Sequence, residues 1–149
     1  MSLKEKIKDD IKQAMRDRNE SRLSTLRMLS AAIQRREIDE RIQLDDAQVL
    51  VVIEKLVKQG REAIEQYVKG GRPELAAKES GEIAIWQAYL PQQLSEAEID
   101  KLIAEAVVAT GASSVKDMGK LMGVLKPQLQ GRADMGQVGS KVKAKLGAA

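Results

Sequence analysis

Cysteine, histidine and phenylalanine are absent from this chain of 149 residues, which holds one tryptophan and two tyrosines. Without thiols or imidazoles there is no cysteine nucleophile, no histidine base and no zinc site of the usual kinds. Carboxylates, lysines, serines and tyrosines remain, but none stands in the spacing of a nucleophile elbow, a phosphate-binding loop or an S-x-x-K motif. The sequence therefore predicts no catalytic residue, no metal site and no cofactor.

Long apolar runs are absent as well. Hydrophobic residues make up 43% of the chain, yet no segment approaches the roughly 20 uninterrupted apolar residues that span a bilayer. The first residues, Met1 to Lys6, lack the apolar region of a secretory signal, and there is no cysteine for a disulfide framework. We expect a soluble, cytoplasmic protein with no membrane association.

The net charge is only +3, but it is unevenly distributed. Residues 1–115 carry 18 Lys and Arg against 20 Asp and Glu, whereas residues 116–149 carry 7 against 2. A cluster of positive charge favours polyanions such as RNA or DNA at low salt. Lysine-rich ends also occur on proteins that bind no nucleic acid, so charge alone leaves both interpretations open.

Apolar residues recur at helical spacing along nearly the whole chain, and this spacing continues through the strand-like run from Val49 to Ile53. An all-α fold is therefore predicted. In the N-terminal half the expected helices cover residues 3–16, 20–40, 46–69 with Asp45 as N-cap, and 73 to 88 or 89. Met15 and Ile38 are expected on buried faces, and the second helix is expected to be the long antiparallel partner of the third.

The second helix carries a dense set of arginines, among them Arg22, Arg27, Arg35 and Arg36. They are interpreted as a solvated face paired with acidic residues of the same helix, namely Glu20, Glu37, Asp39 and Glu40. The alternative is a second phosphate-contacting surface.

A domain boundary is predicted around Pro91, which disfavours helical geometry at Leu90. Ser95 with Glu98 then has the spacing of a capping box and opens the next helix. We expect a helical domain of about four helices over residues 1–91, and a small three-helix domain over residues 95–149.

The C-terminal domain is predicted to hold helices over residues 96–110, 115–126 and 135–146. Ser114 with Asp117, and Asp134 with Gln137, have capping-box spacing at the second and third of them. Its expected core consists of Leu102, Ile103, Val107, Met118, Leu121, Met122, Leu125, Val138, Val142 and Leu146.

Two glycines stand out in the helix expected over residues 115–126. On a helical projection Val115 joins its apolar face, while Gly119 and Gly123 lie on the polar face together with Lys116 and Lys120. A solvent-facing glycine costs roughly 1 kcal/mol relative to alanine in a helix interior. Either the glycines let a phosphate backbone or a partner helix approach, or they mark a helix boundary or close packing within the chain.

The segments YLPQQLSEAEID and MGKLMGVLKPQLQGRADMGQVGSKVKAKL, in this order after a helical N-terminal half, resemble the GatB/YqeY family. The resemblance covers the whole chain for YqeY-type proteins, and mainly residues 95–146 for the tail of the B subunit of the tRNA-dependent amidotransferase. That tail is a small helical module associated with recognition of the tRNA body. The resemblance brings no catalytic residue with it, so a label of carbon–nitrogen ligase would be inherited from the family alone.

The resemblance implies a non-catalytic accessory protein that binds tRNA or another structured RNA through its C-terminal module. A protein-interaction module that receives a partner helix on the glycine strip is the alternative, and the oligomeric state stays open. The residues expected to contact RNA or a partner are Lys116, Gly119, Lys120, Gly123, Lys126, Gly131, Arg132, Lys141, Lys143 and Lys145.

Overall fold

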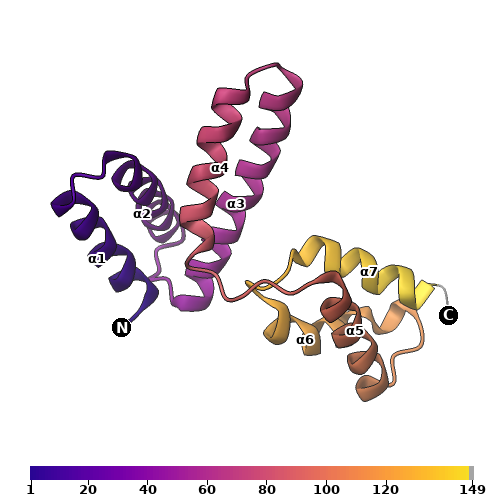
Figure 1. Cartoon of the computed structure of the whole chain (residues 1–149). Coiled ribbons are helices and arrows are strands. Elements are labelled where there is room, and N and C mark those ends of the chain that lie inside the picture. Colours follow the sequence, from indigo (N-terminus) through magenta and orange to yellow (C-terminus); the bar gives the residue numbers. More distant parts are fainter. Residues whose placement is uncertain (148–149) are drawn as a thin grey trace. The chain divides into compact units, whose positions relative to one another are not determined.

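The computed structural model describes residues 1–147, and its elements within that range are seven α-helices and one 3₁₀ helix (Figure 1). No β-strand occurs there, so the predicted all-α fold is confirmed. The chain forms two compact units, Met1–Leu90 and Pro91–Ala149. Residues 148 and 149 of the predicted domain 95–149 lie outside the described residues. The elements are α1 (Leu3–Arg16), α2 (Glu20–Glu40), α3 (Asp46–Lys69), α4 (Pro73–Gln87), α5 (Glu96–Thr110), η1 (Val115–Asp117), α6 (Met118–Leu129) and α7 (Met135–Gly147).

Local signals place the helix ends of the N-terminal unit. Asp45 and Gln48 form the predicted capping box at the start of α3. Pro73 is the first residue of α4, where its missing N–H costs no helical bond. Gly71, with a φ of 70°, reverses the chain between α3 and α4. No helix within residues 1–147 is long and apolar enough to cross a membrane.

The core of this unit is made where α1, α2, α3 and α4 meet. Leu26, Leu29 and Ile53 are fully buried, and Trp86 is 2% exposed. The indole N–H of Trp86 donates to the backbone carbonyl of Thr25 over 3.1 Å, so the ring bonds α4 to α2 as well as filling space.

The predicted contact of α2 with α3 exists, but it is the smaller one, because α3 packs most extensively against α4. Gly60 of α3 is buried at this interface. A Cβ atom there would lie 2.8 Å from Cγ1 of Ile83. The absence of a side chain at position 60 therefore lets the two helices approach closely.

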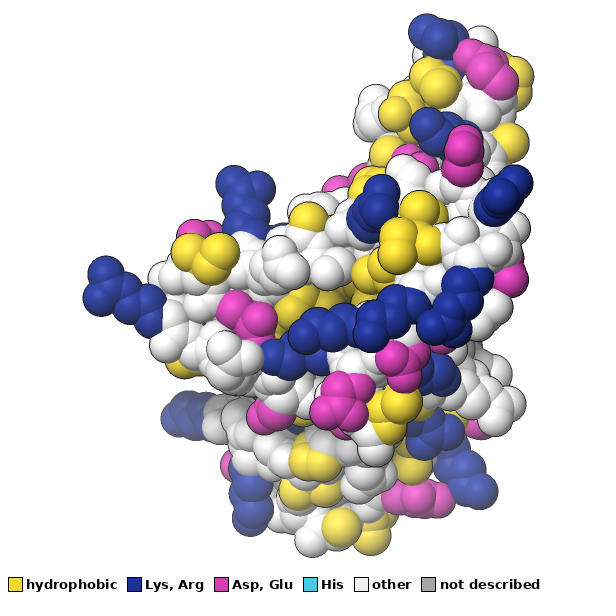
Figure 2. Space-filling model, turned by 90° about the vertical axis from the view of Figure 1, so that its left-hand side faces the viewer, with side chains coloured by type: hydrophobic (Ala, Val, Ile, Leu, Met, Phe, Trp, Pro, Cys, Tyr) yellow, Lys and Arg dark blue, Asp and Glu magenta, His cyan; other side chains and the backbone are white. Residues whose placement is uncertain are grey.

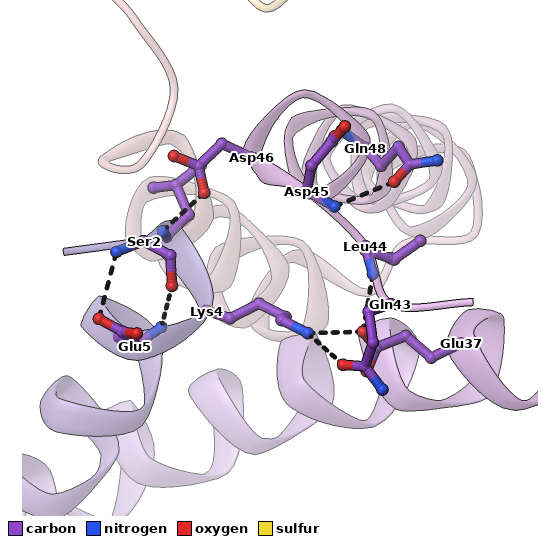
Figure 3. Close-up of polar contacts among 10 residues, drawn as sticks. Ser2, Lys4, Glu5, Glu37, Gln43, Leu44, Asp45, Asp46 and Gln48 are labelled. Atoms are coloured by element: carbon purple, nitrogen blue, oxygen red, sulfur yellow. Dashed lines mark hydrogen bonds and ion pairs between the residues drawn. The ribbon is translucent and has the colours of Figure 1, made fainter.

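A polar cluster joins the start of α1 to the end of α2 and the loop after it (Figure 3). The ammonium group of Lys4 donates to Glu37 over 2.6 Å and to Gln43 over 2.9 Å. The same Glu37 oxygen accepts the backbone N–H of Leu44 over 2.8 Å. These bonds favour the ionised carboxylate and hold the pKa of Glu37 below its usual value of 4.5.

This cluster explains why two predictions for α2 differ from the structure: the partner of Glu37 and the burial of Ile38. The expected pairing within α2 is confirmed for Arg36 with Glu40, but it is wrong for Glu37, whose partner is Lys4 of α1. Because Glu37 faces α1, the next side chain, Ile38, turns away and is 74% exposed. Met15 is also 48% exposed, while its neighbour Ala14 takes the buried position.

The C-terminal unit packs α5, α6 and α7 around a second core. All ten predicted core residues lie in it or against it, and the structure adds Ile99, Ala106, Leu129 and Ala133. The helix α5 has its predicted bounds. Its capping box is only half formed: the Ser95 hydroxyl accepts the Glu98 N–H, but the Glu98 carboxylate bonds to that hydroxyl instead of to the backbone.

The helix expected over residues 115–126 is shifted. Val115 to Asp117 form a 3₁₀ turn, which leaves Val115 46% exposed, and α6 runs from Met118 to Leu129. The helix continues through Pro127 because its last turn buries Leu129 completely. Such burial yields about 1.5–3 kcal/mol, comparable to the roughly 3 kcal/mol cost of an interior proline.

We predict opposite effects of alanine at two glycines of the α3–α4 hairpin. Gly60→Ala is expected to destabilise the N-terminal unit by about 1–3 kcal/mol, because its methyl group overlaps Ile83. Gly81→Ala meets nothing within 4 Å and is expected to stabilise by up to about 1 kcal/mol. Urea unfolding followed by Trp86 fluorescence measures both; equal effects would contradict the packing.

The lowered pKa of Glu37 predicts a pH dependence. Its carboxylate contributes stability fully above pH 4.5, and this contribution is lost as the pH falls through the lower folded-state pKa. Glu37→Gln is expected to be less stable than the wild type at neutral pH, and the difference should close on acidification. Glu62→Gln, an exposed change on α3, serves as control in unfolding measurements between pH 6 and 3. A gap between wild type and E37Q that stays constant over this range would refute the role of Glu37.

Candidate nucleic-acid interface

The helix α6 has one buried side and one exposed side. Leu121, Leu125 and Leu129 recur every four residues and are fully buried. The exposed side carries the α6 strip, which we define as Lys116 of η1 together with Gly119, Lys120, Gly123 and Lys126. The predicted polar face is therefore an exposed surface.

The glycines of the α6 strip are not needed for packing within the chain. A Cβ atom added at Gly119 or at Gly123 would meet no atom within 4 Å. Gly119 is the second residue of α6, near a helix start, whereas Gly123 lies in the helix interior. The close-packing alternative is thus wrong for both glycines, and the boundary alternative fits only Gly119.

Pro127 removes one backbone hydrogen bond beneath the α6 strip. In a regular helix the N–H of residue 127 would donate to the carbonyl of Gly123, but proline has no N–H. Gly123 is exposed and has no side chain to cover its backbone. Its carbonyl therefore lacks the usual helical donor, and the ring of Pro127 takes the place of that N–H.

The lysines of the α6 strip form no ion pair with any described residue. The nearest acid is Asp117, whose carboxylate accepts the backbone N–H groups of Ser113 and Ser114 over 2.9 and 3.2 Å. These two bonds, with a smaller contribution from Lys120, lower the pKa of Asp117. The carboxylate thus caps the turn through the backbone, as predicted.

The three predicted lysines of α7 do not lie together. Lys141 bonds to Asp100 of α5 over 2.9 Å, which raises the pKa of the lysine, and lies 3.8 Å from Glu96. Lys145 comes one turn later on the same side of α7. Lys143 instead lies one turn after Gly139, which faces Met118 at the start of α6. Of the three, only Lys143 therefore lies on the side of α7 that faces the start of α6.

Gly131 and Arg132 form a turn that closes the C-terminal unit. Gly131 is buried with a φ of 79°, and its carbonyl accepts the side-chain amide of Gln93 over 2.6 Å. The carbonyl of Arg132 accepts the N–H of Leu94 over 2.9 Å, and its guanidinium donates to the carbonyl of Gln92 over 3.2 Å. Position 131 thus needs glycine for its conformation. The sequence shows a glycine there but does not show this reason for it.

The ten predicted contact residues therefore divide into two groups. The five of the α6 strip share one surface, and Lys143 lies on the side of α7 that faces the start of α6. Gly131, Arg132 and Lys141 are engaged within the unit, and Lys145 lies on the side of α5. Residues 91–149 carry eight Lys and Arg against six Asp and Glu. The positive charge of the C-terminal end is therefore partly balanced by α5.

The described residues offer no assembled metal centre, since no three or more carboxylate, thiol or imidazole groups lie together. The buried Tyr89 of the YLPQQLS segment donates its hydroxyl to Asp10 of α1. Burial and this acidic neighbour raise the pKa of the phenol. Tyr89 thus anchors the end of α4, while Gln93 of the same segment holds the turn at Gly131.

The sequence profile described as Yqey-like protein matches residues 4–146. The chain belongs to the YqeY-like family. The match extends over both units and over the segments that the turn at Gly131 brings together.

Relatives of this YqeY-like chain are fungal proteins with the name "Altered inheritance of mitochondria protein 41, mitochondrial". The protein from Eremothecium gossypii is 38% identical over 101 residues, which cover 67% of this chain and 55% of the relative. That from Lachancea thermotolerans is 34% identical over 121 residues, 76% of this chain and 65% of the relative. That from Pyrenophora tritici-repentis is 27% identical over 146 residues, 96% of this chain and 80% of the relative.

The predicted cytoplasmic location is contradicted by these relatives, whose names place them in mitochondria. The prediction used the absence of an apolar leader, which marks secretion. Mitochondrial transit segments are amphipathic and carry no such apolar region. The observation therefore did not distinguish the cytoplasm from mitochondria.

Alanine at two glycines of this unit is predicted to have opposite effects. Gly123→Ala should keep or raise stability, by up to about 1 kcal/mol, because the added methyl group points into open space. Gly131→Ala should destabilise by about 1–3 kcal/mol, because alanine is strained at a φ of 79°. Thermal unfolding followed by circular dichroism at 222 nm measures both. Destabilisation by Gly123→Ala would mean that the glycine serves the fold.

Proposed function

We propose that this YqeY-like protein is a non-catalytic accessory protein that binds tRNA or another structured RNA through the α6 strip. The observation that supports it is the combination of two open glycines with three lysines that have no acidic partner among the described residues. Glycines let a backbone approach a helix surface, and the lysines supply contacts to phosphates.

The surface suits a structured RNA better than a flexible single strand. Single-strand binders stack bases on aromatic side chains, and this chain has only three aromatic residues, all in the N-terminal unit. The open space at Gly119 and Gly123 gives room for a ribose with its 2′-hydroxyl, a group that DNA lacks. Binding would therefore depend on backbone shape and on the sugar.

The names of the relatives mention mitochondria and no RNA, so the proposal rests on geometry and on the resemblance of the C-terminal unit to the amidotransferase tail. No ligase activity is proposed, because no matched residue is a catalytic one. A helix of a partner protein could also bind at the open glycines. Measuring tRNA binding by lysine variants of the α6 strip distinguishes the two ligands, because only an RNA site should lose tRNA affinity when the lysines are replaced.

The proposal predicts a salt-sensitive affinity for tRNA. With Lys116, Lys120, Lys126 and Lys143 neutralising roughly four phosphates, log K should fall with log salt at a slope of about −3 to −4. Fluorescence anisotropy of labelled tRNA with the full chain, at several salt concentrations, measures this slope. A DNA hairpin of the same stem sequence should compete more weakly.

A lysine triple variant tests the surface itself. Lys116→Gln, Lys120→Gln and Lys126→Gln together should weaken binding and bring the slope to about −1, since each lost phosphate contact removes about one unit. The control carries the same three changes at Lys12, Lys58 and Lys69, which are exposed on α1 and α3. If both triples weaken tRNA equally, or neither does, the α6 strip is not an RNA site.

A further inference from the structure

The N-terminal unit has a second open surface, a groove of about 840 Å³ between α2 and α3. Its floor is apolar, and two of the floor side chains, Met28 and Val51, are 44% and 38% exposed. Figure 2 shows exposed hydrophobic side chains next to a row of Lys and Arg side chains on this unit. The floor of this α2–α3 groove consists of Met28, Ala31, Ala32, Val51, Val52 and Leu56.

The groove continues along α2. A neighbouring hollow of about 630 Å³ shares Met28 and Ala31 with it and extends to Leu23. From Leu23 to Ala32 the apolar lining of α2 covers about 14 Å, at a rise of about 1.5 Å per residue. The apolar floor is thus long enough for roughly two and a half turns of a helix.

The two walls of the groove carry unpaired positive charge. Arg35 on α2 and Lys55 on α3 both line it and are exposed, and neither forms an ion pair with a described residue. Arg36 differs, since it pairs with Glu40 and donates to the carbonyl of Gln48 over 3.3 Å. The middle of the groove is therefore cationic above an apolar floor, with Asp39 nearer the loop between the helices.

This combination indicates one kind of ligand. An apolar floor between two helices fits the apolar side of a third helix. The two free cations complement carboxylates at the edges of such a helix. No aromatic side chain lines the groove on which a base could stack. We propose that the α2–α3 groove binds an amphipathic helix of a partner protein, with acidic side chains of that helix between Arg35 and Lys55.

Two labelled peptides test this inference with the full chain. Both are helical peptides of about 14 residues, with leucines repeating every three or four positions. One carries glutamates beside the apolar side, and the other carries lysines at the same positions. Anisotropy should show that the glutamate peptide binds about tenfold or more tightly than the lysine peptide. In amide NMR spectra the shifted signals should belong to α2 and α3.

Charge reversal supplies the matched variants. Arg35→Glu with Lys55→Glu should abolish the preference for the glutamate peptide and favour the lysine peptide. Arg61→Glu with Lys12→Glu makes the same change in charge at exposed positions that do not line the groove, and should leave the preference intact. Met28→Ser should weaken both peptides. All variants change exposed side chains, and their amide spectra confirm the fold.

Other outcomes overturn the inference. The occupant is a second copy if sedimentation shows a dimer of the chain alone that Met28→Ser dissociates. The groove is an RNA site if tRNA, and not the glutamate peptide, shifts the α2 and α3 amide signals. Binding of neither peptide, or equal binding of both, also refutes it. None of these results bears on the α6 strip, which lies in the other unit.

Discussion

A short pairing of two segments closes the C-terminal unit, and the surface of this unit depends on it. The segment from Gln92 to Leu94 bonds to the turn at Gly131 and Arg132 through one backbone hydrogen bond and two hydrogen bonds from side chains to carbonyls. The pairing joins the segment that leads into α5 to the turn between α6 and α7. It thereby helps to set α6 against the core with its leucines inward. The two open glycines face outward as a result.

Much of this fold could be predicted, because many helix ends are decided by neighbouring residues. The capping residues Asp45, Ser95 and Asp134 each accept backbone N–H groups two or three positions ahead. Helical periodicity also identified most of the buried side chains. Where local signals agreed with packing, the predicted bounds of α1, α2, α3 and α5 match the structure.

The remaining features depend on contacts between residues far apart in the sequence. Pro127 is a local stop signal, but the burial of Leu129 outweighs it. In the sequence Lys141 is one lysine of a basic segment, and only the packing of α5 places Asp100 beside it. Gly131 and Gly123 are the same letter, yet one has a positive φ and the other lies in a helix with open space around it. The groove between α2 and α3 has no local sequence signature, since residues of two separate helices line it.

The contact between Gly60 and Ile83 has a consequence for how the family can vary. The two positions share one volume at the α3–α4 interface, with only 2.8 Å between a Cβ atom at 60 and the isoleucine. A larger residue at 60 is tolerated only if residue 83 becomes smaller. Positions 60 and 83 should therefore change together in evolution: a homologue with alanine at the first would carry valine or alanine at the second. Gly81, on the open side of the same hairpin, has no such coupling and can be replaced without a compensating change.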